Sequence, residues 1–253
     1  MYHWYHYAIA IIGSAIAGGI NTLAGNGSAI TLPILMEVLG LPETVANATN
    51  RVGIFTQNIA STFSYYKNGK LDVARSWLQI LLIVSGAIVG VVAATVISNE
   101  GFAQVFRYLM VVMLLLVLVK PSRWLREQKA ERPLPLWLNI PMLLGLGFYG
   151  GFIQMGFGVF FLAVMVLGAG FNFLNSNVLK SAVILIYTAI VLAIFHYKGL
   201  IDWKIGALMA LGQTTGGFLA AEFAVKYPNS GKWAYRILIA VIIVAIFRLF
   251  GVL

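Results

Sequence analysis

The sequence predicts an all-α integral membrane protein with two homologous four-segment repeats and about 7–8 transmembrane helices. Three observations support this fold class. Of the 253 residues, 60% are hydrophobic and 10% are charged, and the mean hydropathy is +0.90, which is outside the range of soluble globular proteins. Several stretches of roughly 18–25 residues carry almost no charge, which suits a hydrocarbon core of about 30 Å. Similar motifs also recur about 130 positions apart.

Helices explain the apolar stretches better than strands do. Membrane β-strands alternate apolar and polar side chains, whereas a segment such as 237–247 is apolar throughout. Each half of the chain is predicted to contain a long apolar stretch followed by three ordinary helices. The expected segments are 7–40, 44–66, 77–97 and 102–119, and then 138–170, 174–197, 204–224 and 234–252.

The two halves share motifs in the same order. Tyr66-Lys67-Asn68-Gly69 is echoed by Tyr197-Lys198-Gly199, and Gly18-Gly19 by Gly150-Gly151. Prolines interrupt the polar segment between the halves. We therefore expect a first transmembrane repeat at 1–119, a basic cytoplasmic linker at 120–137 and a second transmembrane repeat at 138–253.

The leading stretch of each half is too long for one spanning helix. As a single helix, residues 7–40 would reach about 51 Å, so the stretch must break. Gly25-Asn26-Gly27-Ser28 and Gly156-Phe157-Gly158 are the predicted breaks, because glycines weaken helices. Paired breaks in two halves are typical of a transporter's binding site.

The sequence leaves the topology of these broken stretches open. If each crosses the membrane once, there are eight spans and parallel repeats. If each is a re-entrant hairpin, each half crosses three times and the repeats are inverted. Both arrangements place the 67–75 loop and the 120–132 linker in the cytoplasm.

The charge and cysteine content exclude several other classes of protein. There are 17 Lys and Arg against 8 Asp and Glu, a net charge of +9. Many cations lie in the linker, which fits the positive-inside rule rather than a nucleic-acid interface. The absence of cysteine excludes disulfides and thiolate metal sites. His3 and His6 lie among tyrosines and Trp4 in an aromatic interface belt, so we predict no metal and no cofactor.

Small polar residues surround the predicted breaks. They are Asn21, Thr22, Asn26 and Ser28 in one half and Gln154 in the other. Amides, hydroxyls and backbone N–H groups at a helix N-terminus suit an anion. The alternative is that small polar residues only allow close helix packing.

A second polar set follows in each half. Its members are Asn47, Asn50 and Arg51, mirrored by Asn177, Lys180 and Ser181. Arg51 and Lys180 lie inside apolar helices, where a cation is costly and usually faces a bundle interior or a cavity. They could instead snorkel to lipid headgroups. We predict that both cations serve one central anion-binding site.

Glu37 is the acid within the first broken segment and is a candidate for proton coupling. A neutral structural carboxylic acid, or a carboxylate exposed at a loop, would explain the same residue.

Several of these motifs together resemble one known family. They are Gly18-Gly19, Gly25-Asn26-Gly27-Ser28, Pro33, Leu39-Gly40-Leu41-Pro42, Ala46-x-Ala48-Thr49-Asn50 and Tyr66-Lys67-x-Gly69. In this order and spacing the chain resembles the TauE/SafE sulfite exporters, also called probable membrane transporter proteins, over essentially its whole length. The family often has further glycines where this chain has Asn26 and Ser28, and often a Ser where it has Asn50. The resemblance implies transport of sulfite, sulfonates or related anions across a bacterial cytoplasmic membrane.

The predicted function is therefore secondary transport of a small anion. An anion channel would use similar residues. An intramembrane hydrolase would need Ser28 as nucleophile with a base such as His196 within hydrogen-bond reach. The expected partners are the anion and membrane lipid, without nucleic acid, and a homodimer is left open.

Overall fold

The computed structural model describes residues 3–70, 77–105, 108, 135–168, 173–227, 233 and 236. This part of the chain is helical and contains no strand. The helices of the N-terminal half are α1 (Trp4–Ala24), α2 (Ser28–Pro33), the π-helical turn η1 (Ile34–Val38), α3 (Glu43–Lys67) and α4 (Trp77–Val96). The C-terminal half contains α7 (Leu136–Phe152), α8 (Phe157–Leu162), η3 (Ala163–Gly168), α9 (Phe173–Tyr197) and α10 (Trp203–Lys226).

The predicted helix bounds agree with the structure to within a few residues. The segments expected at 44–66 and 77–97 correspond to α3 and α4, and those at 174–197 and 204–224 correspond to α9 and α10. The linker ends slightly earlier than expected, because α7 begins at Leu136. Most of 102–119, residues 120–134 and nearly all of 234–252 lie outside the described residues.

The first broken stretch folds back on itself. Gly25 ends α1 with a left-handed φ of 83°, and its N–H bonds to the Asn21 carbonyl at 2.9 Å. The returning chain then passes close to α1, since a Cβ added to Gly27 would lie 2.4 Å from the Ala17 carbonyl oxygen. Further along, a Cβ on Gly13 would lie 2.4 Å from the Ile34 side chain. We call α1, α2 and η1 the first hairpin and residues 25–27 its tip.

The second broken stretch also folds back, but its break is one turn earlier than predicted. Residues 153–156 separate α7 from α8, with φ of 60° at Gln154 and 73° at Gly156. The Phe160 ring returns to pack against Tyr149, with centroids 5.1 Å apart. Gly156 lies in the break as predicted, but the prediction is wrong for Phe157 and Gly158, because both are already inside α8. We call α7, α8 and η3 the second hairpin and residues 153–156 its tip.

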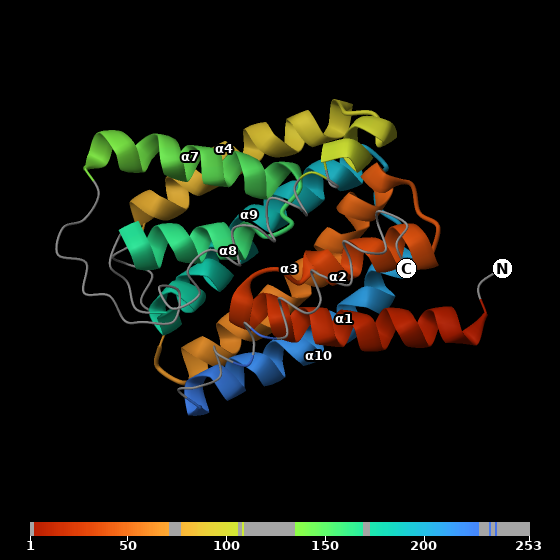
Figure 1. Ribbon diagram of the computed structural model, residues 1–253, viewed down its shortest axis with the longest axis horizontal. Coiled ribbons are helices and arrows are strands. Elements are labelled where there is room, and N and C mark those ends of the chain that lie inside the picture. The colour runs from red at the N-terminus through yellow and green to blue at the C-terminus, as the bar shows by residue number, and fades with distance from the viewer. Residues whose placement is uncertain are drawn as a thin grey trace.

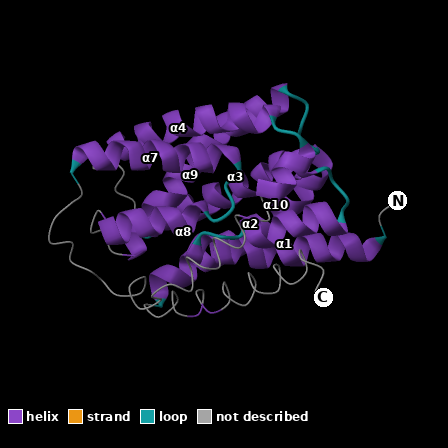
Figure 2. Ribbon diagram, turned by 45° about the horizontal axis from the view of Figure 1, so that its top comes forward, coloured by secondary structure: helices purple, strands orange, loops and turns teal. Residues whose placement is uncertain are grey.

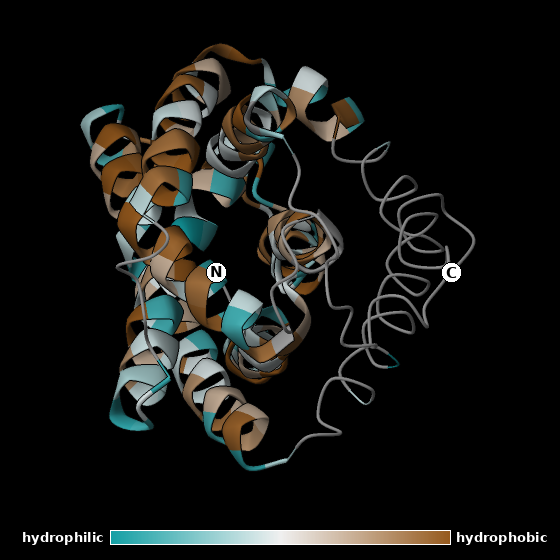
Figure 3. Ribbon diagram, turned by 90° about the vertical axis from the view of Figure 1, so that its left-hand side faces the viewer, coloured by the Kyte–Doolittle hydropathy of each residue, from teal (hydrophilic) through white to brown (hydrophobic). Residues whose placement is uncertain are grey.

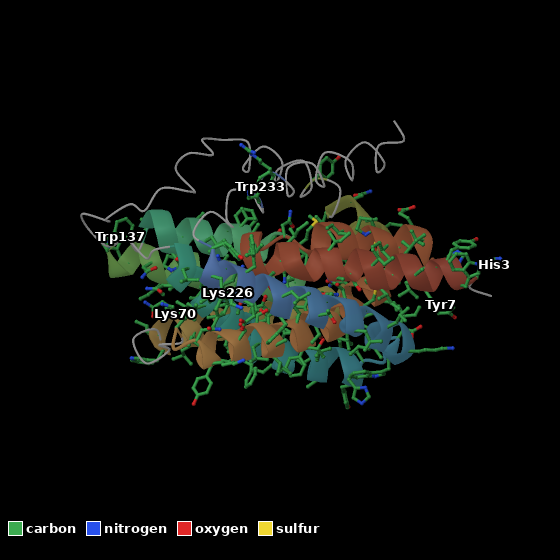
Figure 4. The ribbon with its side chains drawn as sticks, turned by 90° about the horizontal axis from the view of Figure 1, so that it is seen from below. His3, Tyr7, Lys70, Trp137, Lys226 and Trp233 are labelled. Atoms are coloured by element: carbon green, nitrogen blue, oxygen red, sulfur yellow. The ribbon has the colours of Figure 1, made fainter. Side chains whose placement is uncertain are left out.

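The two hairpins meet near their tips. The Gly158 N–H donates to the Gly25 carbonyl at 3.0 Å, and a Cβ on Gly158 would lie 2.2 Å from the Gly25 Cα. Both positions therefore require glycine for this approach. The hairpins enter from opposite ends of the molecule, since His3 beside α1 and Trp137 in α7 lie at opposite ends (Figure 4).

Helices of the two halves are interleaved. α10 packs against α1 and α3, while α4 packs against α7 and α9 (Figures 1 and 2). These helices form two groups, α1, α3 and α10 in one and α4, α7 and α9 in the other. In both groups, glycines allow the helix backbones to approach closely. A Cβ on Gly216 of α10 would lie 1.8 Å from the Ala15 carbonyl oxygen, and one on Gly86 of α4 would lie 2.1 Å from that of Leu144. Contacts between α3 and α9 join the two groups.

The outer faces of the bundle are apolar. Large exposed hydrophobic residues include Ile12 and Ile16 on α1, Val89 and Val92 on α4, and Leu219 on α10. Figure 3 looks along the bundle and shows hydrophobic residues on the outward sides of several helices. Three described helices are long and apolar enough to cross a membrane, namely Trp4–Ala24, Trp77–Val96 and Leu174–Tyr197. An apolar exterior around a polar interior is the arrangement expected in lipid.

Candidate functional site

One face of α3 points at both hairpins. Asn47, Asn50 and Arg51 are spaced i, i+3 and i+4, which places them on the same side of the helix. All three are at most 2% exposed. They therefore lie in the interior of the bundle, and the snorkelling alternative does not describe Arg51.

Arg51 binds the end of the second hairpin's leading helix. Its Nη1 donates to the Gly150 carbonyl at 2.8 Å, and its Nη2 donates to the Gly151 carbonyl at 3.1 Å. Nη1 also donates to the Gln154 side-chain oxygen. Gly150 and Gly151 belong to the last turn of α7, whose carbonyls have no partner within the helix. A cation is favourable there because the helix dipole is negative at its C-terminus.

Lys180 makes the reciprocal contact from α9. Its Nζ donates to the Asn21 and Thr22 carbonyls, both at 2.9 Å, in the last turn of α1. It also donates to the Asn177 side-chain oxygen at 2.6 Å. Lys180 is 1% exposed, so it does not snorkel either. Each half thus supplies the cation that caps the leading helix of the other half.

Two asparagines repeat this crosswise pattern. The Asn47 amide donates to the Phe152 carbonyl of α7 at 2.9 Å, and the Asn177 amide donates to the Leu23 carbonyl of α1 at 3.3 Å. The donors Asn47 and Asn177 are 130 positions apart, and their acceptors Leu23 and Phe152 are 129 positions apart. The two contacts therefore join corresponding positions of the two halves to within one residue.

A hydrogen-bond network holds the predicted residues Asn21 and Thr22. Asn21 Nδ2 donates to Gln57 Oε1 at 3.1 Å, and Gln57 Nε2 donates to Thr22 Oγ1 at 3.0 Å. The Thr22 hydroxyl also pairs with that of Ser61 at 3.0 Å. Sequence reasoning missed Gln57 and Ser61, although Asn50, Gln57 and Ser61 have the i, i+7, i+11 spacing of one helix face.

Ser28 and Asn50 connect α2 with α3 and α10. Asn50 Nδ2 donates to Ser28 Oγ at 3.1 Å, and Gln213 Nε2 of α10 donates to Asn50 Oδ1 at 3.4 Å. Sequence reasoning also missed Gln213, which is the single amide of α10 and is followed by Thr214 and Thr215. No periodic signal marks it.

Gln154 combines an unusual backbone with a cationic partner. It is the one non-glycine residue with positive φ among those the structure describes. That region is unfavourable for a residue with a Cβ. Its side chain accepts from Arg51, which connects the tip of the second hairpin to α3.

Several buried polar atoms near the hairpin tips have no partner among the described residues. Asn26, 0% exposed, makes no bond with either side-chain atom. Asn47 Oδ1, Arg51 Nε and Ser181 Oγ are also unpaired. Buried polar groups are nearly always satisfied, so each exception needs an explanation.

Other candidate residues lie away from this region. Glu37 is exposed on η1. His196 is exposed at the end of α9 and accepts from Trp203 Nε1 at 3.2 Å, whereas Ser28 is bonded to Asn50. The structure therefore does not bring His196 to Ser28. The described residues include no group of three His, Cys, Asp or Glu that could hold a metal ion.

The fold and the site together define a membrane protein with an apolar exterior and buried cations between two hairpins, which is the arrangement of a transporter. The chain matches the family described as "Sulfite exporter TauE/SafE" over residues 10–249 and belongs to that family. This confirms the resemblance seen in the sequence.

Relatives from several bacteria agree with this assignment. The chain is 27% identical to "Probable membrane transporter protein ORF9" of Sinorhizobium sp, over 86% of this chain and 83% of that protein. It is 24% identical to a "Probable membrane transporter protein" of Haemophilus influenzae, over 89% and 87%. It is 25% identical to "Probable membrane transporter protein YfcA" of Escherichia coli, over 83% and 78%. No solved structure matches the chain significantly. The family is described as a sulfite exporter and these relatives as probable membrane transporter proteins, and none of them is described as an enzyme.

Proposed function

We propose that the protein is a secondary transporter that moves a small anion, such as sulfite, a sulfonate or a related organic anion, across the bacterial cytoplasmic membrane. One observation carries this proposal: Arg51 and Lys180 are buried where the two hairpins meet, and in the part of the chain that the structure describes they donate to carbonyl and amide oxygens and to no carboxylate. The one ion pair among the described residues joins Lys226 to Glu222, at the end of α10.

The balance of charge favours an anion. A helix C-terminus carries the equivalent of about half a negative charge, so two helix ends offset about half of two positive charges. A positive charge of about one unit then remains in a low-dielectric interior, where it attracts an anion far more strongly than in water. The unpaired Arg51 Nε and Asn26 Nδ2 are donors that an anion could use.

The crosswise contacts support an inverted repeat. We propose that each half consists of a re-entrant hairpin and three spans, because both broken stretches fold back and enter from opposite ends (Figure 4). The end that carries Lys70 and Trp137, which also receives the basic linker, is then cytoplasmic by the positive-inside rule. The N-terminus lies on the opposite side.

Topology can be tested directly because the chain contains no cysteine. Lys70→Cys and His3→Cys would each carry a single thiol. A membrane-impermeant thiol reagent added outside intact cells should label the His3→Cys variant and spare the Lys70→Cys variant until the membrane is opened. Labelling of both from outside would contradict the inverted arrangement.

The function is tested by neutralising each cation in turn. Purified wild type, Arg51→Gln and Lys180→Gln would be reconstituted and assayed for flux of sulfite, sulfate, sulfonates and carboxylates, with binding followed by thermal stabilisation. We expect at least about a tenfold loss of binding in each neutral variant, since a close charge pair in the interior exceeds 1.4 kcal/mol. The charge-retaining Arg51→Lys and Lys180→Arg variants should keep most of the wild-type affinity for the anion.

Two results would count against the proposal. If the neutral variants insert normally and bind and transport like wild type, the cations are structural caps without a role in anion binding. If conductance far exceeds carrier turnover and shows no saturable exchange, the protein is an anion channel instead. Exposed Lys204, changed to Gln, is the matched control and should leave flux unchanged.

A further inference from the structure

Asn26 stands out among the buried amides of the hairpin tips. It lies between Gly25, which contacts Gly158 of the second hairpin, and Gly27, whose N–H donates to Asn21 Oδ1. Its side chain is 0% exposed, yet neither Nδ2 nor Oδ1 has a partner among the residues that the structure describes. An amide buried in this way is unfavourable unless something else completes its bonds.

Neighbouring amides are satisfied by the protein itself. Asn21 uses both side-chain atoms, donating to Gln57 and accepting from Gly27, and Asn50 donates to Ser28 and accepts from Gln213. Among the buried amides that the structure describes, Asn26 is distinguished because both of its side-chain polar atoms are unpaired. Asn26 lies two positions before Ser28, the first residue of α2, which places it close to a residue that contacts α3.

The unpaired atoms are of both kinds. Arg51 Nε and Asn26 Nδ2 are donors, whereas Asn26 Oδ1 and Asn47 Oδ1 are acceptors that only a donor can satisfy. Rotating the Asn26 amide exchanges its two ends but leaves one donor and one acceptor. A fully deprotonated oxyanion offers acceptors alone and would leave the amide oxygens unpaired.

Building on the proposed anion transport, we infer that Asn26 selects the substrate, and that the substrate is an oxyanion that also carries a hydrogen-bond donor next to its anionic group. The donor is a protonated oxygen, a hydroxyl or an amine. This group donates a hydrogen bond to Asn26 Oδ1 or Asn47 Oδ1. The anionic oxygens accept hydrogen bonds from Asn26 Nδ2 and Arg51. Because Asn26 is fully buried, the hairpin tips part to admit the anion.

A pair of matched probes isolates this requirement. Sulfamate and methanesulfonate have the same charge and nearly the same shape, but sulfamate carries an amino group where methanesulfonate has a methyl group. We would measure binding of each to the purified full-length protein by calorimetry, and exchange of each in proteoliposomes. Wild type should bind sulfamate about five- to tenfold more tightly, as expected for a buried hydrogen bond.

Variants assign the preference to a residue. Asn26→Leu should bring the ratio of the two affinities close to one, and Asn26→Ala serves if the larger side chain prevents folding. Asn58→Leu is the matched control, since Asn58 is equally buried but donates to Ile54 within its own helix at 2.7 Å. It should keep the wild-type ratio.

The outcomes separate this inference from the proposed function. If both probes bind equally to wild type, or if Asn26→Leu and Asn26→Ala keep the preference, Asn26 does not select for a donor, although anion transport stands. If neither these probes nor sulfite binds, the proposed function fails and this inference fails with it.

Discussion

Replacing Arg51 with Met should strongly destabilise the protein, because it removes the cap of α7. The guanidinium donates to two carbonyls of the last turn, at 2.8 and 3.1 Å, and to Gln154. A hydrogen bond from a charged donor contributes about 1.5–3 kcal/mol, but removing a buried charge recovers part of its desolvation cost. Two carbonyls and the Gln154 side-chain oxygen would lose this donor, and at about 1–3 kcal/mol for each buried group left unsatisfied we expect the free energy of unfolding to fall by about 3–5 kcal/mol.

Replacing Lys180 with Met should destabilise the protein to a similar extent. Lys180 also makes three bonds, two of them to the last turn of α1, so Lys180→Met should lower the free energy of unfolding by a similar amount, about 3–5 kcal/mol. Arg51→Lys should lose less than Arg51→Met, because an ammonium keeps the charge but lacks the fork that spans two carbonyls. Exposed Lys204→Met should remain within about 0.5 kcal/mol.

Reversible unfolding in mixed micelles, followed by tryptophan fluorescence, measures these differences. The double variant adds a further test, because the hairpins touch at Gly25 and Gly158 and their stabilities should be coupled. We expect a coupling energy above about 0.5 kcal/mol. A loss below about 1 kcal/mol for both Arg51→Met and Lys180→Met would refute the capping argument.

Three further predictions concern the hairpins. Gly25→Ala should lower the free energy of unfolding by about 1–3 kcal/mol more than Gly69→Ala in the same assay. Both residues have positive φ, but only Gly25 has backbone within 2.3 Å of the added Cβ. Equal losses of stability in the two variants would exclude a role for the tip contact. Gln57→Leu should lower stability by about 1–3 kcal/mol, because Asn21 and Thr22 lose a partner; an unchanged unfolding midpoint would show that the network is dispensable. Glu37→Gln should reduce flux driven by an imposed pH gradient if Glu37 couples transport to protons, and unchanged gradient dependence would remove it from that role.

The structure adds little to the proton-coupling hypothesis. Glu37 is exposed on η1 and is not one of the buried polar residues near the hairpin tips. Its position in the first hairpin is the remaining argument for the experiment. Glu37 lies inside an apolar stretch of the sequence and is nevertheless exposed. One face of a membrane helix can still reach water or headgroups, so the stretch alone does not predict that a residue is buried.

The sequence alone determined the class of protein and most helix bounds. Long uncharged stretches fit only a lipid environment, and α3, α4, α9 and α10 lie where the apolar pattern predicted them. It also identified Arg51 and Lys180, because a cation inside an apolar helix is conspicuous in any arrangement of the helices.

Only the tertiary structure decided how the broken stretches run and what the cations contact. Glycine permits a turn without setting its direction, so the reversal at Gly25 became evident only from the packing of Ile34 against Gly13. The partners of Arg51 and Lys180 are backbone carbonyls about 100 and 158 positions away, and a carbonyl has no sequence signature. Gln213 was missed for a related reason, since its role depends on the contact between α10 and α3, which periodicity within one helix does not contain.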